Sequence, residues 1–144
     1  MVPKDENAPG WPGKVGKWKT GAKDAVGGLI LQSNRIWFTI GHGICDEIYY
    51  PRHDSISIRD CGLIVTDGKE FFSEEQYDTI HAVSWIEDGV PEIIITNTCK
   101  RGHYRITKKI YVDPFRDTLV QRIQFDALKG TADLYHVSLL AGYN

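Results

Sequence analysis

The sequence predicts an all-β protein, an antiparallel β-sandwich or barrel built from many short strands. Apolar and polar residues alternate with a period of two in several segments, most clearly from Tyr104 to Val112. Turn residues such as Asp67-Gly68 and Asp88-Gly89 separate these segments at nearly regular spacing. No amphipathic helix of useful length is visible, so the strands of this 144-residue chain are expected to form its core as an antiparallel sandwich or barrel.

The first 24 residues are predicted to form an extended arm that precedes a sandwich over residues 25–144. The arm is rich in Gly, Pro and Lys and carries Trp11 and Trp18 without strand or helix periodicity. Two tryptophans are costly to leave in water, so we expect their rings to hold the arm against the sandwich. The alternative is a disordered leader, although such segments usually lack tryptophan.

The first half of the sandwich is predicted to contain a hairpin around Gly41-His42-Gly43. A strand from Val26 to Leu31 precedes it, and Pro51 ends its second strand because proline cannot donate to a ladder. The segment from Cys61 to Thr66 then turns at Asp67-Gly68. From Ser73 to Asp78 the sequence favours one helical turn or an acidic loop, with Ser73 as the helix N-cap.

The second half is predicted to contain strands only. Tyr104, Ile106, Ile110 and Val112 are expected to point inward, and Lys108 interrupts this apolar set. The other strands are expected over Ile80 to Glu87, from Glu92 through three consecutive isoleucines, around Leu119 to Phe125, and from Ala132 to Leu140.

The last predicted strand is apolar on both faces. Tyr135, Val137 and Leu139 alternate with Leu134 and Leu140, so both faces need cover. An exposed apolar edge invites pairing with another chain. We therefore expect more protein to follow Asn144.

Composition argues against nucleic-acid and membrane partners. The formal charge is -2, the pI is near 6.2, and basic residues are mixed with acidic ones rather than gathered in a stripe. No apolar run approaches the roughly 20 residues that a membrane helix needs. The first seven residues are too polar for a signal peptide, so a cytoplasmic location is expected, or a secreted one if the chain is trimmed.

The cysteines predict neither a disulfide framework nor a metal site. Cys45, Cys61 and Cys99 cannot all pair within the chain, and none lies in a CxxC motif. His42 and Cys45 have the offset of metal ligands, but no second pair follows at the spacing of a zinc site. No metal or cofactor is therefore predicted, and the cysteines are interpreted as small apolar residues in strands.

The segment from Ile36 to Pro51 allows two interpretations. In the first, His42 with Asp46 and Glu47 forms a proton-handling group, because a histidine beside carboxylates suits acid and base catalysis. In the second, the segment is a hairpin with aromatic side chains packed across its strands. The residues alone leave both open.

Several motifs resemble one known family, the amino-terminal β-sandwich domain of prokaryotic glucoamylases and glucodextranases. The resemblance rests mainly on a central block from Arg35 to Glu75, with the sequence RIWFTIGHGICDEIYYPRHDSISIRDCGLIVTDGKEFFSEE. Further matching stretches are APGWPG at residues 8–13, KWKTGAKDAVG at 17–27, ITNT at 95–98 and YRITKKIYVDPFRDTLVQRIQF at 104–125. Together they cover most of the chain.

The resemblance implies an accessory domain without catalytic residues. In this family a supersandwich, also seen in galactose mutarotases, precedes a helical (α/α)6 domain that removes glucose from non-reducing ends of α-glucans with inversion. Inversion requires a separated acid and base, and the family's catalytic glutamates lie in the helical domain, where this chain has no matching position. The family's sandwich is also longer than 144 residues, so this one is expected to be incomplete.

The leading hypothesis is therefore a domain that stabilises and shapes a catalytic (α/α)6 partner, encoded in the same chain or separately. Its contact surface is expected between residues 36 and 60. The candidates for interface or sugar contact there are His42, Glu47, Tyr49, Tyr50, Arg52, His53, Arg59 and Asp60.

Two other hypotheses remain. A carbohydrate-binding module for α-glucans would stack sugars on exposed rings, with Trp11, Trp18, Trp37, Trp85, Tyr49 and Tyr50 as candidates. A mutarotase-like enzyme would use a histidine and a glutamate, either His42 with Glu47 or His81 with Glu92, and rests on fold analogy alone.

Overall fold

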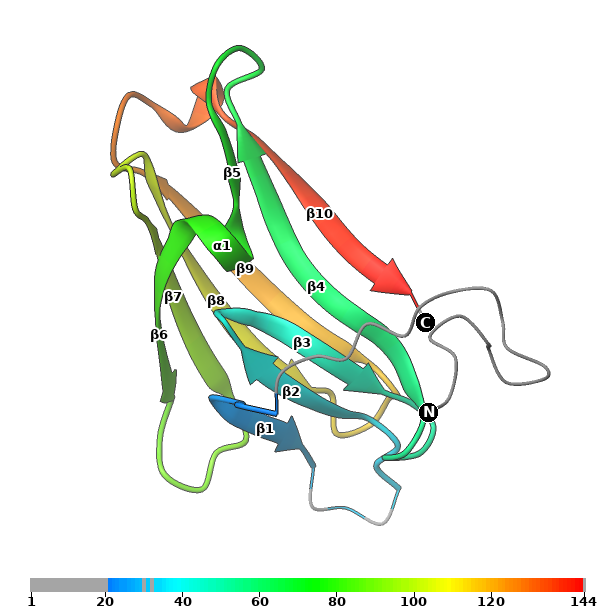
Figure 1. Cartoon of the computed structure of the whole chain (residues 1–144). Coiled ribbons are helices and arrows are strands. Elements are labelled where there is room, and N and C mark those ends of the chain that lie inside the picture. Colours follow the sequence, from blue (N-terminus) through cyan, green and yellow to red (C-terminus); the bar gives the residue numbers. More distant parts are fainter. Residues whose placement is uncertain (1–20, 30, 32, 144) are drawn as a thin grey trace, which may run out of the picture.

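Two antiparallel sheets pack face to face in the computed structural model, which describes residues 21–29, 31 and 33–143 (Figure 1). This confirms the predicted all-β sandwich. The predicted arm, including Trp11 and Trp18, lies almost entirely outside the described residues. Within the described part of the chain, no helix is long and apolar enough to cross a membrane.

The first sheet contains the predicted hairpin at its centre. Its strand order is β1-β2-β3-β4-β10, with the short β5 also paired to β4. The strands are β1 (Ala25–Gly28), β2 (Trp37–Gly41), β3 (Ile44–Tyr49), β4 (Ile56–Thr66), β5 (Phe72–Glu74) and β10 (His136–Tyr143).

The second sheet is a meander in the order β6-β7-β8-β9. A single helical turn, α1 (Glu75–Asp78), carries the chain from β5 into this sheet, and a 3-10 turn, η1 (Ala132–Leu134), leads out of it. The strands are β6 (Thr79–Trp85), β7 (Ile93–Cys99), β8 (Tyr104–Val112) and β9 (Leu119–Ala127).

Three local predictions were wrong. Ser73 does not cap α1: it lies in β5, its hydroxyl lies 2.7 Å from the Tyr104 hydroxyl, and the N-cap position belongs to Glu74. The first strand ends at Gly28 rather than Leu31. The last strand begins at His136 rather than Ala132, because residues 132–134 form η1, and it continues to Tyr143.

The core lies between the central strands of the two sheets. One buried cluster joins Phe38, Ile40 and Cys45 of the first sheet to Ile93, Ile95 and Ile110 of the second. At Gly27 an added Cβ would lie 2.1 Å from the Phe38 ring, so glycine is needed there for this packing. All three cysteines are buried and free, which confirms their interpretation as core residues. Burial raises the pKa of Cys45 and keeps its thiol protonated.

A buried ion pair connects the two sheets. Glu75 of α1 and Lys108 of β8 are 0% and 1% exposed, and the Lys108 ammonium lies 2.5 Å from Glu75 Oε2. The Asn97 amide nitrogen donates to Glu75 Oε1 at 2.6 Å and to the Gly43 carbonyl at 2.7 Å. Lys108 does lie in the inward row of β8, as its position in the alternation predicts, and Glu75 neutralises it there.

Glu75 fills a gap in the first sheet. β3 pairs with β4 as far as Cys61, and β5 begins to pair with β4 only at Ile64. Between these points the backbone N–H of Leu63 donates to Glu75. One carboxylate thus satisfies a strand donor, an amide and an ammonium, which is what allows these polar groups to be buried.

We expect Lys108→Met to destabilise the protein by about 3–5 kcal/mol, because removal of one partner leaves Glu75 buried without its counter-charge. Urea unfolding followed by circular dichroism measures this. The matched control is Lys109→Met, the next residue of the same strand, which should change stability by less than about 0.5 kcal/mol. Equal effects of the two substitutions would contradict the role given to the pair.

The destabilisation by Lys108→Met should depend on pH. Burial raises the pKa of Glu75 above its usual value, and the Lys108 charge is the largest effect that opposes this. A carboxyl with a raised folded-state pKa contributes stability at low pH that is lost as pH rises through that pKa. The loss caused by Lys108→Met should therefore be smaller at pH 5 than at pH 8, and a loss independent of pH would exclude titration of Glu75.

Candidate functional site

The outer face of the β2–β3 hairpin brings together an aromatic pair and a charged cluster. Trp37 lies directly opposite Tyr49, and Thr39 lies opposite Glu47, so their side chains share one face of the sheet. The register of β2 and β3 shifts between Thr39 and Ile40, which leaves Asp46 as the extra residue of a β-bulge. The carboxylates of the consecutive residues Asp46 and Glu47 therefore both lie near one cation, Lys23.

Lys23 joins the two carboxylates of this cluster. Its ammonium pairs with Asp46, which is fully buried, and lies 3.2 Å from Glu47 Oε2. The Tyr49 hydroxyl donates to the same Glu47 oxygen at 2.9 Å. These four side chains are defined here as the Lys23 cluster.

Lys23 and Tyr49 of the Lys23 cluster both keep their protons near neutral pH. Burial lowers the pKa of Lys23, but its hydrogen bonds to Asp46 and Glu47 raise it by more. The net pKa is above the usual value, so the ammonium stays charged. Burial and the Glu47 carboxylate raise the pKa of Tyr49 to about 12, so its phenol stays protonated. A structural ion cluster fits these properties better than general acid and base catalysis does.

Tyr50, Arg52 and His53 lie at the end of the hairpin where β3 leads into β4. The Arg35 guanidinium lies 5.2 Å from the centroid of the Tyr50 ring and pairs with Asp117 of the β8–β9 turn. His53 meets the Trp37 ring edge-on, with centroids 5.9 Å apart. Beside this group, Asn34, Arg35, Phe115 and Asp117 line a cavity of about 350 Å³. Phe115 at the tip of the turn is 93% exposed.

His42 lies at the other end of the hairpin. It is exposed in the turn with a φ of 53°, and the adjacent Gly43 is anchored to β7 by the hydrogen bond from Asn97. About four residue steps of roughly 3.3 Å separate the turn from the Trp37–Tyr49 pair. Among the predicted candidates, His42 therefore lies apart from Tyr50, Arg52 and His53.

The proposed histidine and glutamate pairs are not assembled as active sites. Glu47 is engaged by Lys23 and Tyr49 rather than held against His42. His81 lies opposite Asn97 with its Nε2 3.5 Å from Asp24, whereas Glu92 bonds through its backbone to Ile86. Five residues of an extended strand separate these places, or about 16 Å.

Arg59 and Asp60 lie in β4 beside the Lys23 cluster. The register that pairs Cys45 with Cys61 and Ile48 with Ile58 places Asp60 opposite Asp46. On its other side Asp60 pairs with Gly142, and Arg59 occupies the position where the β4–β10 register shifts. The side chains of Arg59 and Asp60 are half-buried, whereas those of a routine surface ion pair would be exposed.

Within the described part of the chain, the rings named for sugar binding do not form one platform. Trp37 and Tyr49 are neighbours on the first sheet, but Trp85, 49% exposed, ends β6 of the second sheet. Tyr50 belongs to the loop beyond them. Among the described residues no three His, Cys, Asp or Glu side chains are grouped so that they could hold a metal ion.

Sequence reasoning missed several members of these groups. Lys23 was placed in the arm, and Arg35 and Asp117 were not singled out. Lys23 contacts a residue 23 positions away and Arg35 one 82 positions away. No local pattern reports such contacts, because they depend on how the strands are arranged in the two sheets.

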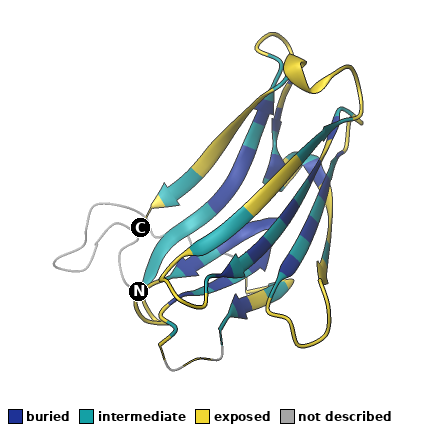
Figure 2. Ribbon diagram, turned by 180° about the vertical axis from the view of Figure 1, so that it is seen from behind, coloured by how far each residue is buried: buried dark blue, intermediate teal, exposed yellow. Residues whose placement is uncertain are grey.

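The two edge strands β9 and β10 expose side chains on the face that points toward the core. Val137 and Leu139 lie opposite the buried Val65 and Leu63, yet they are 41% and 65% exposed. Ile123 lies opposite the buried Lys108 and is 45% exposed. Figure 2 shows exposed stretches on both strands beside the buried central strands. We call these three residues, together with the 76% exposed Tyr143 at the end of β10, the open edge.

Three comparisons agree on the nature of the chain. The family model for glucodextranase domain N matches residues 8–141. A glucoamylase of Clostridium sp. (strain G0005) is 38% identical over 128 residues, which is 89% of this chain and 18% of the relative. A crystal structure of a bacterial glucoamylase complexed with acarbose matches with a TM-score of 0.84 and 36% identity, over 89% of this chain and 19% of that one. The chain thus spans about a fifth of the proteins that it resembles.

Proposed function

The chain belongs to the family of glucodextranase N-terminal domains, and from this premise we propose that it is a non-catalytic accessory domain of a glucoamylase-type hydrolase. Its role is to stabilise and shape a catalytic (α/α)6 domain that releases glucose from non-reducing ends of α-glucans. The partner belongs to the same protein or is encoded separately.

The open edge carries this proposal. A strand whose core-facing side chains are exposed gains stability when further protein covers it, at about 25 cal/mol per Å² of apolar surface. Exposed edge strands also have unpaired backbone groups that recruit other strands. Because relatives of this chain are about five times longer, their remaining length is the natural source of that cover.

The arrangement of charges supports a role without catalysis. Glu75 forms an ion pair with Lys108 in the buried network, and Asp46 and Glu47 form ion pairs with Lys23. An inverting hydrolase needs an acid and a base about 6.5–9.5 Å apart around a space for sugar and water. The carboxylates described above instead neutralise cations within the fold.

A second candidate function is carbohydrate binding by the outer face of the hairpin. The adjacent rings of Trp37 and Tyr49, beside the Glu47 carboxylate, offer apolar surface with a polar group at its border. Titration of the chain with maltooligosaccharides, followed by tryptophan fluorescence, tests this. A saturable change that is lost in Tyr49→Ala but kept in Trp85→Ala favours it, and a flat titration excludes it.

The accessory role can be tested in a chimera in which this chain replaces the matching segment of the Clostridium glucoamylase. We expect deletion of the segment to lower yield and melting temperature, and the chimera to restore both. Leu139→Asp in the chimera should destabilise it by about 2 kcal/mol or more, because the partner would bury an unpaired charge.

The matched control for Leu139→Asp is Ile80→Asp on β6, since Ile80 is 67% exposed and lies away from the open edge. It should leave the chimera stable. A deletion variant with unchanged stability and unchanged glucose release would overturn the accessory role.

Within the same chimera we expect Tyr50→Ala and His42→Ala to weaken stability rather than the bond-breaking step. Tyr50→Ala removes the contact with Arg35, worth about 0.5–1 kcal/mol. His42→Ala also places alanine at positive φ, so His42→Gly, which relieves that strain, separates a lost contact from a strained turn. Thermal melting and kcat for maltose measure both effects, and a large fall in kcat with stability intact would contradict the assignment.

A further inference from the structure

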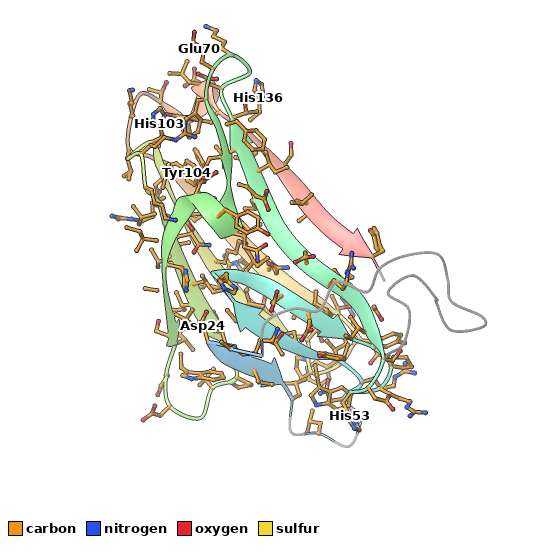
Figure 3. All side chains as sticks on the ribbon, viewed as in Figure 1. Asp24, His53, Glu70, His103, Tyr104 and His136 are labelled. Carbon is orange, nitrogen blue, oxygen red and sulfur yellow. The ribbon has the colours of Figure 1, made fainter. Side chains whose placement is uncertain are left out.

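Aromatic rings gather at the end of the sandwich opposite His53 (Figure 3). The His103 ring stacks on Phe71 with centroids 4.0 Å apart and planes 7° apart. The Arg101 guanidinium lies over the Phe71 ring, 4.5 Å from its centroid. Tyr135 meets both rings edge-on, at 81° to Phe71 and 84° to His103. The rings come from three separate connections of the chain, and each fixes the orientation of the others.

A cavity of about 410 Å³ opens beside these rings. This volume lies within the range of roughly 300–1,000 Å³ that is usual for small-molecule sites. Phe71 does not line it, whereas His103 and Tyr135 do, so these two rings form adjoining walls nearly perpendicular to each other. The remaining lining side chains are Asp67 and Lys69 from the β4–β5 turn, and Lys129 and Leu134 from the β9–β10 connection.

Hydrogen bonds within the lining determine which atoms of Tyr135 and His103 remain free to contact a ligand. The Tyr135 hydroxyl donates to the Lys129 carbonyl at 2.7 Å, so it can accept from His103 Nδ1, 3.2 Å away. His103 then carries its proton on Nδ1 and keeps a lone pair on Nε2. Burial, with the charges of Lys129 and Arg101, lowers the pKa of His103, so the ring is neutral at pH 7.

The polar groups of the cavity are mixed in sign. The Asp67 carboxylate accepts hydrogen bonds from the backbone N–H groups of Lys69 and Phe71, each at 2.9 Å, and these lower its pKa. It therefore stays ionised as an acceptor, and the ammonium groups of Lys69 and Lys129 supply donors. The lining therefore offers hydrogen-bond donors and acceptors side by side, rather than the cations alone that an anion would need. A ligand with hydroxyls that both donate and accept, and with an apolar face for the rings, matches the lining.

We propose that this cavity binds one glucosyl unit of an α-glucan, with the sugar in the corner between the His103 and Tyr135 rings and its hydroxyls bonded to Asp67, Lys69 and Lys129. The choice of glucose rests on the proposed function, whereas the choice of a neutral sugar rests on the cavity itself. The site is separate from the Trp37–Tyr49 face and from the open edge, and it would hold substrate chains near a catalytic partner.

The test is a titration of the 144-residue chain with maltotriose, followed by backbone amide NMR. We expect saturable shift changes confined to residues 67–71, 101–104 and 128–135, with a millimolar dissociation constant. Lys69→Met combined with Lys129→Met should weaken binding at least ten-fold, and because both lysines are exposed the fold should be unaffected. The control is Lys109→Met on the outer face of β8, which should bind as the parent sequence does.

Each other outcome overturns part of the proposal. Absence of saturable changes removes the site, and changes confined to Trp37 and Tyr49 move binding to the hairpin face. Equal binding of cellotriose removes the preference for α-glucans, and tighter binding of inorganic phosphate at the same residues replaces the neutral sugar by an anion. The titration uses the chain alone, so it is independent of the chimera that tests the accessory role.

Discussion

The buried contact between Glu75 and Lys108 is the interaction on which the arrangement of the two sheets depends. Glu75 lies on the helical turn that carries the chain from one sheet to the other, and Lys108 lies at the centre of β8. Through Asn97 the same carboxylate is linked to the Gly43 turn of the hairpin, and through Leu63 to β4. A pair of this kind adds less net stability than apolar packing would, but it penalises any register in which either charge loses its partner.

This network also determines where the charged groups of the hairpin lie. The hairpin turn is held by Asn97, which fixes where His42 emerges, and the bulge at Asp46 directs a second carboxylate toward Lys23. The two ends of the hairpin therefore present different chemistry. His42 stands alone at one end, and rings and arginines gather at the other. Their separation is better suited to contact with a large partner than to reaction at a point.

The sandwich has two kinds of exposed surface with different physical needs. The open edge on β9 and β10 exposes side chains that share a face with buried core residues, so its need is for protein cover. The cavity lined by His103 and Tyr135 is shaped by ring stacking and by hydrogen bonds within this chain, so it is formed without a partner. The open edge and the preformed cavity fit the two proposed roles, which are support of a neighbouring domain and binding of its substrate.

The sequence by itself determined the fold class, the hairpin, most strand positions, the buried cysteines and the family, because the period of two, the turn residues and the motifs are local signals. It wrongly predicted Ser73 as a helix cap, whereas the Ser73 hydroxyl is hydrogen-bonded to that of Tyr104. It also placed the start of the last strand too early, at residues that form a 3-10 turn. Only the tertiary structure decided that Lys108 is neutralised by Glu75, that Lys23 joins Asp46 and Glu47, and that the His103 and Tyr135 rings, from two different connections, line one cavity. These contacts join residues far apart in the chain, and their partners are fixed by strand order and register, which no local pattern encodes.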